Sequence, residues 1–113
     1  MTFKALLASK DNGAVSIDLV ELDDADLLPG DVTITVEYST VNYKDALALS
    51  GRVPVIERYP LIPGIDLAGT VQASSHPDFA AGDRVVLNGW ALGQSHHGGY
   101  AQRARVNGDW LVK

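Results

Sequence analysis

The sequence of 113 residues contains no cysteine. This absence excludes a disulfide framework, a thiolate zinc site and a cysteine nucleophile together. A chain without thiols also needs no oxidising compartment. The composition therefore favours a cytoplasmic protein.

The sequence also has few basic residues and no long apolar run. Nine Lys and Arg stand against fourteen Asp and Glu, which gives a formal net charge of -5. Nucleic acids and anionic membranes select basic surfaces, so neither is predicted as a partner. No apolar run approaches the roughly 20 residues of a membrane span, and residues 1–4 lack the apolar centre of a signal peptide.

A dinucleotide-binding Rossmann motif is missing as well, because no G-x-G-x-x-G follows a strand and no strand–helix–strand unit of about 30 residues is present. The 11 glycines instead separate short apolar segments that read as strands. These are residues 3–8, 15–22, 31–39, 65–73, 100–106 and 110–112, together with 79–87, which is a turn that leads into a buried strand. Many short strands with glycine corners predict a mainly β fold, a partly open β-barrel with one or two short helices.

Alternation predicts how two of these strands face the core. Residues 15–22 change the phase of their alternation after Leu19, which predicts an irregularity near the end of that strand. Residues 31–39 alternate without interruption, and this is the most secure strand. Its expected buried face is Val32, Ile34, Val36 and Tyr38.

Residues 42–50 change to a helical period, carried by Tyr43, Ala46, Leu47 and Leu49. Asn42 can cap the start of this helix and Gly51 can end it. Its first residues therefore lie at a strand-to-helix junction, where a rigid frame can hold reactive groups. Asp66 lies in an apolar strand, where a carboxylate is costly unless it is hydrogen-bonded. Asp66 is either part of a polar site or a satisfied structural residue.

Four segments in order resemble the N-terminal, GroES-like catalytic domain of the medium-chain dehydrogenases/reductases: 41–45, 63–71, 81–85 and 98–102. The resemblance covers essentially the whole chain and supports the predicted barrel. Within that superfamily the chain is most similar to the zinc-free acrylyl-CoA reductase group, which is quinone oxidoreductase-like. The segments that carry this finer match are 42–47, 87–90, His96 and 104–112.

The resemblance implies an activity. Zinc alcohol dehydrogenases of the superfamily place a cysteine where Asn42 stands and a histidine–glutamate pair where Ile65 and Asp66 stand, so no zinc is expected. Without a Lewis acid, the implied chemistry is hydride transfer from NADPH to an activated carbon–carbon double bond. Residues 1–113 would be the GroES-like catalytic domain, a fragment of a two-domain reductase that is homodimeric at full length. The Rossmann domain, which would hold most of the NADPH, is not in this chain.

The resemblance also implies roles for individual residues. We expect Tyr43 and Asp66 to be catalytic, with Tyr43 a hydrogen-bond donor and aromatic wall. The plain alternatives are helix packing for Tyr43, capping for Asn42, and solvent exposure for Lys44 and its neighbour Asp45, which points away from Lys44. The remaining expected site residues are Asn42, Tyr43 and Lys44 for the cofactor, and Trp90 and Arg52 in the substrate cleft.

His96 and His97 are adjacent, so on an extended segment they face opposite ways, and two histidines make a thin ligand set. A loop role is favoured over a metal site. The function that these expectations support best is reduction of a 2-enoyl thioester, acrylyl-CoA to propanoyl-CoA. A quinone or enone reductase and a non-enzymatic binding module with the same barrel remain alternatives.

Overall fold

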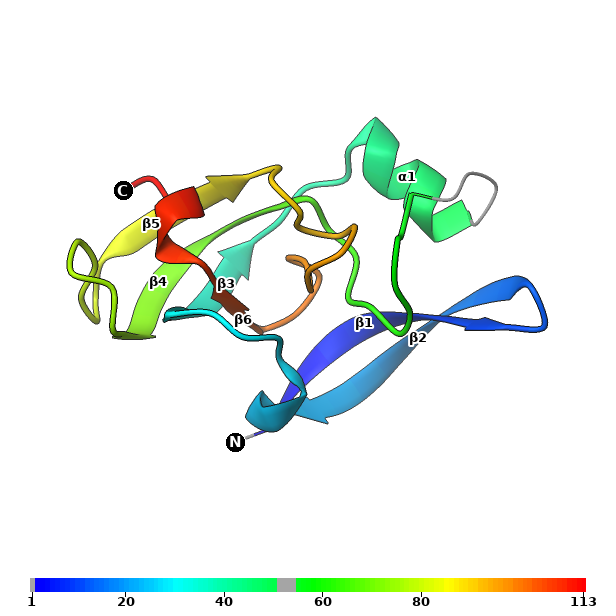
Figure 1. The fold of residues 1–113 in the computed structure, drawn as a ribbon, viewed down its shortest axis with the longest axis horizontal. Coiled ribbons are helices and arrows are strands. Elements are labelled where there is room, and N and C mark those ends of the chain that lie inside the picture. The colour runs from blue at the N-terminus through cyan, green and yellow to red at the C-terminus, as the bar shows by residue number, and fades with distance from the viewer. Residues whose placement is uncertain (1, 51–54) are drawn as a thin grey trace.

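A computed structural model describes residues 2–50 and 55–113, and it is mainly β, as predicted (Figure 1). The turn and strand predicted over 79–87 are confirmed, whereas the strand predicted over 100–106 is shorter than expected. Within the described residues no helix is long and apolar enough to cross a membrane. The elements are β1 (Thr2–Asp11), β2 (Ala14–Asp23), η1 (Asp24–Asp26), β3 (Val32–Tyr38), α1 (Tyr43–Ser50), β4 (Asp66–Ser74), β5 (Arg84–Asn88), β6 (Arg103–Val106) and η2 (Gly108–Trp110), where η denotes a 3-10 turn.

The strands form two antiparallel sheets (Figure 1). One is the β1–β2 hairpin, and the other has the order β5-β4-β3-β6. The hairpin turns at Asn12 and Gly13, which both have the positive φ that an Asn-Gly turn supplies. Beyond its pairing with β2, strand β1 is joined to the other described residues by isolated β-bridges to Ala101 and Leu61. The predicted partly open barrel is therefore confirmed, with no continuous ladder between the two sheets.

The main core lies against the inner face of the four-stranded sheet. Its side chains alternate along each strand, as the period of two requires. Removing such a side chain from water contributes about 1.5–3 kcal/mol before the ordering cost is subtracted. The buried members are Val32, Ile34, Leu67, Val71, Val85, Leu87, Leu92, Ala104, Val106 and Leu111.

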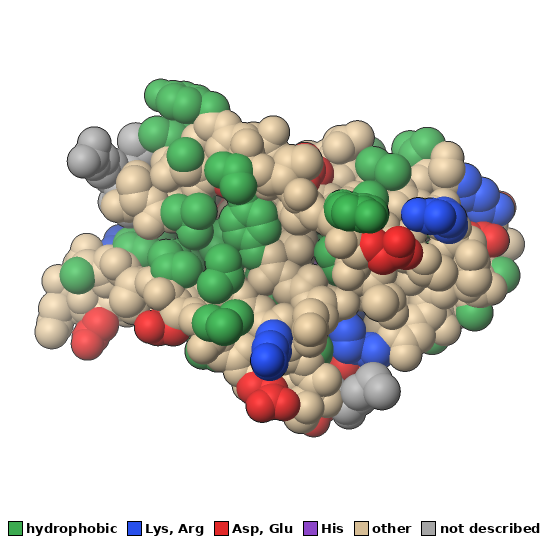
Figure 2. Space-filling view, turned by 180° about the vertical axis from the view of Figure 1, so that it is seen from behind, with side chains coloured by type: hydrophobic (Ala, Val, Ile, Leu, Met, Phe, Trp, Pro, Cys, Tyr) green, Lys and Arg blue, Asp and Glu red, His purple; other side chains and the backbone are tan. Residues whose placement is uncertain are grey.

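The hairpin buries opposite faces at its two ends. Near its base Phe3 and Leu22 are paired and pack in one apolar cluster, whereas towards its tip Ala8 and Ile17 are paired and pack in another. The pairing of β1 with β2 is continuous, so the irregularity predicted within 15–22 is wrong. The apolar alternation in β2 changes phase because the apolar clusters at the two ends of the hairpin lie on opposite faces. Figure 2 shows, from behind, hydrophobic side chains gathered between the hairpin and α1.

Tyr38 departs from the predicted buried face of β3. Val36 pairs with Gly69 and Tyr38 pairs with Ala68, so Glu37 is an extra residue in β3. Such a bulge reverses the direction of the side chains that follow it. Tyr38 is consequently 69% exposed on the outer face of the sheet, and the prediction that it lies with Val36 is wrong.

The strand predicted over 110–112 is also wrong. Asn107 caps η2 by accepting a hydrogen bond from the Asp109 N–H, and this turn takes up the first of those residues. Only Val112 pairs in β fashion, through an isolated bridge to Val86 at the edge of β5. A local side-chain cap thus overrides the apolar pattern there.

Candidate active site

Three strand ends and the start of α1 meet at one edge of the four-stranded sheet. Antiparallel pairing sets the end of β3 against the start of β4 through Tyr38 and Ala68, and the end of β5 against the start of β4 through Asn88 and Asp66. The chain passes from β3 to α1 at this same edge. We refer to Thr40, Asn42, Asp45, Asp66 and Tyr100, which gather there, as the polar junction.

Asp66 holds the loop between β3 and α1. Its Oδ1 accepts the Thr40 N–H at 3.2 Å and its Oδ2 accepts the Thr40 hydroxyl at 2.7 Å. Asn42 Nδ2 donates to the same Oδ2 at 3.2 Å. These bonds give the half-buried carboxylate the partners that its position requires. Asp66 is thus a well-satisfied structural residue, and its catalytic role stays a prediction.

Asp45 is the buried centre of the junction, with only 1% of its surface exposed. Its Oδ1 accepts the Ile65 N–H at 2.9 Å, and its Oδ2 accepts the backbone N–H of Asn42 at 3.1 Å. One carboxylate therefore joins the start of α1 to the segment entering β4. Solvent exposure, the plain alternative given above for Asp45, is therefore wrong. The place of Asp45 three residues after Asn42, where a capping-box acid belongs, was the available signal.

Lys44 points away from Asp45, as predicted, and its Nζ donates to Gln94 Oε1 at 2.6 Å. This bond connects the first turn of α1 to the loop that follows β5. The role of Lys44 towards a cofactor stays a prediction.

Asn42 does not cap the helix with its side chain. Its Nδ2 donates to Thr40 Oγ1 at 3.0 Å and to Oδ2 of both Asp45 and Asp66 at 3.2 Å. Its backbone carbonyl accepts the first helical bond, from Ala46 N–H at 3.0 Å. The capping interpretation is therefore wrong: Asp45 caps Asn42, and the amide of Asn42 serves as a donor.

Tyr100 closes the junction from the opposite side. Its hydroxyl donates to the Thr40 carbonyl at 2.9 Å. Burial, together with the nearby carboxylates of Asp45 and Asp66, raises the pKa of Tyr100 to about 12. Gly99 permits this approach, because a Cβ there would overlap the carbonyl oxygen of Asp66. Tyr100 was not among the expected site residues, although it lies in the Gly-Gly-Tyr segment that carries the family resemblance.

Tyr43 stands on the outside of this frame and is 81% exposed. The buried residues of α1 are Asp45 and Ala48, so the expected helical face through Tyr43 and Ala46 is wrong. Helix packing does not account for Tyr43. Its hydroxyl projects from the first turn of a helix whose start is fixed by Asp45.

Trp90 lies two residues beyond β5, at the same edge of the sheet, and is 64% exposed. Its φ of 53° is uncommon for a bulky side chain and marks local strain. Its ring stacks on Trp110 with centroids 6.1 Å apart, and His96 packs edge-on against Trp110. The exposed ring of Trp90 is thus held in place by Trp110 on one face. Arg52, the other residue expected in the substrate cleft, lies outside the described residues.

His96 and His97 face opposite ways, as predicted. His96 Nε2 bonds the Arg105 carbonyl at 2.6 Å, whereas His97 Nδ1 accepts the Ile62 N–H at 3.1 Å. Burial lowers the pKa of both imidazoles. These bonds give both side chains a role in holding the loop. Among the residues that the structure describes, no three His, Asp or Glu side chains are grouped so as to hold a metal ion.

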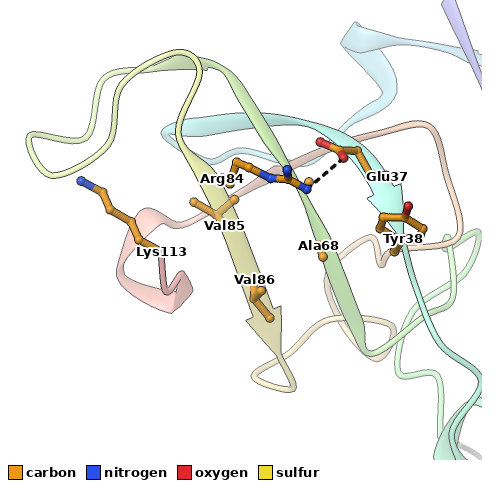
Figure 3. A pocket seen from close by; sticks show the side chains of 8 residues that line it. Glu37, Tyr38, Ala68, Arg84, Val85, Val86 and Lys113 are labelled. Atoms are coloured by element: carbon orange, nitrogen blue, oxygen red, sulfur yellow. Dashed lines mark hydrogen bonds and ion pairs between the residues drawn. The ribbon is translucent and has the colours of Figure 1, made fainter.

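Two shallow cavities lie side by side on the outer face of the sheet. The larger, about 170 Å³, is bordered by the ion pair of Arg84 with Glu37 and by Lys113 (Figure 3). The smaller, about 120 Å³, reaches Asp66 and Thr40, so it is the one that meets the polar junction. The residues that line both cavities are Tyr38, Ala68 and Val86.

Comparison with known proteins agrees with this architecture. The chain is 48% identical over 112 residues to the acrylyl-CoA reductase AcuI of Ruegeria pomeroyi, covering 97% of this chain and 34% of that protein. It is 46% identical over 110 residues to "Putative quinone oxidoreductase YhfP" of Bacillus subtilis, covering 97% of this chain and 33% of that protein. The crystal structure of the yhdH oxidoreductase from Salmonella enterica in complex with NADP superposes with a TM-score of 0.94 at 49% identity, covering 99% of this chain and 34% of that one.

The chain thus spans about a third of the length of these relatives. A family model for the alcohol dehydrogenase GroES-like domain matches residues 28–113, which include α1, the four-stranded sheet and the whole polar junction. This match covers well over half of the sequence. The chain therefore belongs to the alcohol dehydrogenase GroES-like domain family.

Proposed function

We propose that this chain is the catalytic domain of a larger NADPH-dependent reductase that reduces the carbon–carbon double bond of a small 2-enoyl thioester, with acrylyl-CoA as substrate and propanoyl-CoA as product. The observation that carries the proposal is the exposed Tyr43 hydroxyl on a rigid polar junction. The name of the Ruegeria pomeroyi relative supports the choice of substrate, and the NADP in the Salmonella enterica neighbour supports the choice of cofactor.

The residues present fit only one end of such a cofactor. Asn42 and Tyr43 offer a polar amide and an aromatic face beside one another, which suit a nicotinamide ring and its carboxamide. The sequence has no glycine-rich strand–turn–helix to hold a pyrophosphate. The remainder of the NADPH site would come from a Rossmann domain outside this chain. Full-length dimerisation belongs to the same proposal.

The reaction needs a hydride, which bound NADPH supplies. Addition of the hydride to the β-carbon moves the double-bond electrons onto the α-carbon and the thioester oxygen as an enolate. Hydrogen bonds stabilise that oxygen, and a proton delivered to the α-carbon completes the reduction. Tyr43 is our choice for the donor, because its hydroxyl is exposed at the junction. Solvent can then restore the proton that the phenol gives up.

The first test is NADPH oxidation with acrylyl-CoA, measured for the 113-residue chain and for the chain extended to the natural end of its gene. Activity in the extended chain alone supports the split-domain proposal. Activity in neither moves the assignment to another enone, a quinone or a binding module. In that last case the extended gene should also lack a glycine-rich strand–turn–helix.

The second test concerns Tyr43. In the full-length protein Tyr43→Phe should lower kcat/KM about a hundredfold, the usual size of a general-acid contribution. Tyr59→Phe is the matched control, since Tyr59 packs in the apolar cluster beside the hairpin. Equal kcat/KM values for the two variants would remove Tyr43 from the mechanism.

A quinone or enone reductase is the second candidate. It is favoured by the likeness to the quinone oxidoreductase-like relative of Bacillus subtilis and by the exposed ring of Trp90, on which a planar substrate can stack. A substrate panel separates the two candidates. A site specific for CoA should strongly prefer the thioester over a free enone, whereas a ring-binding site should reverse that order.

A further inference from the structure

The orientation of the Asn42 amide is fixed by its surroundings. Two of the groups around its Nδ2 are the carboxylates of Asp45 and Asp66, each 3.2 Å away. An ionised carboxylate accepts hydrogen bonds and donates none. Turning the amide over would place its carbonyl oxygen against both carboxylates, leaving acceptors facing acceptors at a partly buried position. That arrangement is costly, so the NH₂ group must face inward.

Thr40 strengthens the same constraint. Its hydroxyl donates its single hydrogen to Asp66, so its oxygen can only accept from Asn42, at 3.0 Å. The amide has two hydrogens and three acceptors around them. Neither hydrogen is left for a ligand.

The other end of the amide is therefore the end that a ligand meets. Asn42 is only partly buried, and within the described part of the chain no donor lies within hydrogen-bond distance of its Oδ1. Bonds from an NH₂ group to negative acceptors also increase the electron density on the carbonyl oxygen of the same amide. Oδ1 is thus an outward-facing acceptor of increased strength, one residue before the exposed Tyr43.

We propose that Asn42 is an orientation-locked acceptor that binds the N–H of the nicotinamide carboxamide, and that Asp45 and Asp66 are positioning residues that fix this polarity. The inference rests on the proposed function, because it assigns the nicotinamide end to this site. It also has a consequence for the reaction. Asn42 cannot donate a hydrogen bond to the enolate oxygen, so that donor must come from another group.

The direct test compares two cofactors in the full-length protein by fluorescence titration without substrate. One is NADPH, and the other is its reduced 3-acetylpyridine analogue, which keeps the carbonyl but has a methyl group in place of the amine. We expect NADPH to bind about tenfold more tightly, the size of one good hydrogen bond. Equal affinities would overturn the proposal.

Two variants separate the role of the Asn42 acceptor from the role of the carboxylates that fix its orientation. Asn42→Leu removes the acceptor and should bring the ratio of the two dissociation constants close to one. The double variant Asp45→Asn with Asp66→Asn keeps Asn42 but allows its amide to turn over, and it should reduce the ratio as well. A ratio unchanged in the double variant, with the affinity for both cofactors intact, would show that the carboxylates do not set the polarity.

Proton exchange in the unmutated protein tests the orientation of the Asn42 amide even if the double variant does not fold or neither cofactor binds. With ¹⁵N-labelled asparagine, the side-chain NH₂ protons of Asn42, assigned through Asn42→Leu, should exchange with water far more slowly than those of the exposed Asn12. Exchange as fast as at Asn12 would refute the lock. Slow exchange without any cofactor binding would keep the lock and instead reject the proposed function.

Discussion

The inner face of the four-stranded sheet and the polar junction share β4 yet are stabilised in different ways. Leu67 faces the apolar core, and its neighbour Asp66 accepts the hydrogen bonds of the loop before α1. The core depends on volume and apolar area, so a change there costs in proportion to the overlap or cavity it makes. The junction depends on buried donors that each need an acceptor. A substitution in the junction therefore lowers the free energy of unfolding according to the number of donors that it leaves unpaired.

The largest effect is expected where the sheet has no spare volume. Gly69 in β4 lies so close to β3 that a Cβ would overlap the carbonyl oxygen of Thr35. Because backbone cannot move aside as a flexible side chain does, Gly69→Ala should lower the free energy of unfolding by about 3 kcal/mol or more. Urea denaturation measures this change.

Gly82→Ala is the matched control for that variant. Gly82 has a φ of 96° but nothing within 4 Å of the added Cβ, so only backbone strain of about 1 kcal/mol is expected. Equal losses at the two glycines would mean that close packing between β3 and β4 is not the source of the effect.

The junction should respond nearly as strongly to loss of its central acceptor. Asp45→Ala leaves the backbone N–H groups of Ile65 and Asn42 without the acceptor they now share. Buried unpaired donors cost about 1–3 kcal/mol each, and water entering the space left by the side chain offsets part of that, so we expect a loss of about 3 kcal/mol in urea denaturation. Asp18→Ala, at an exposed position of β2, should change stability by less than about 0.5 kcal/mol. A similar small effect at both sites would show that Asp45 does not hold the junction.

The two regions also differ in how far the sequence predicts them. Alternating apolar residues predicted β3 and β4 and most of the core, because burial repeats with the period of the strand. The pattern failed at Tyr38, where the bulge at Glu37 reverses the side chain. It failed again at 110–112, where the Asn107 cap forms η2 instead. Both failures come from single residues that act on local backbone, which periodicity does not register.

The sequence predicted where the polar junction lies but not the hydrogen bonds that form it. The motifs around Asn42 and Asp66 indicated the strand-to-helix junction at which the structure brings these two residues together. Asp45 and Tyr100 were missed because their partners, Ile65 and Thr40, are distant in the sequence and use backbone atoms. Periodicity gives no signal for a side chain that binds the backbone of a segment distant in the sequence.

The third prediction uses pH to compare the two kinds of stabilisation. His97 is buried and neutral, and burial lowers its pKa below the usual value of about 6.5. The unfolded chain therefore binds the proton more readily, so the stability that His97 contributes is present above pH 6.5 and is lost as the pH falls below it. The urea midpoint should decrease from pH 7 to pH 5, and His97→Gln should flatten that decrease.

His76 supplies a control of opposite sign. Its hydrogen bond to Asp109 raises its pKa, so its contribution is present at low pH and is lost as the pH rises through the raised value. His76→Gln should therefore make the decrease towards pH 5 steeper. If both substitutions flattened the profile, burial of His97 would not be its cause.

The smallest effect on stability is expected at the outer surface of the junction. Tyr43 is exposed on α1, and among the described residues its hydroxyl has no hydrogen-bond partner, so Tyr43→Phe should change the free energy of unfolding by less than about 0.5 kcal/mol. Tyr100→Phe removes only a hydroxyl as well, but that hydroxyl donates to Thr40, and we expect a loss of about 1 kcal/mol. Equal losses would mean that the exposed tyrosine is part of the frame. A loss at Tyr100 alone would separate the group that builds the junction from the group that the junction presents.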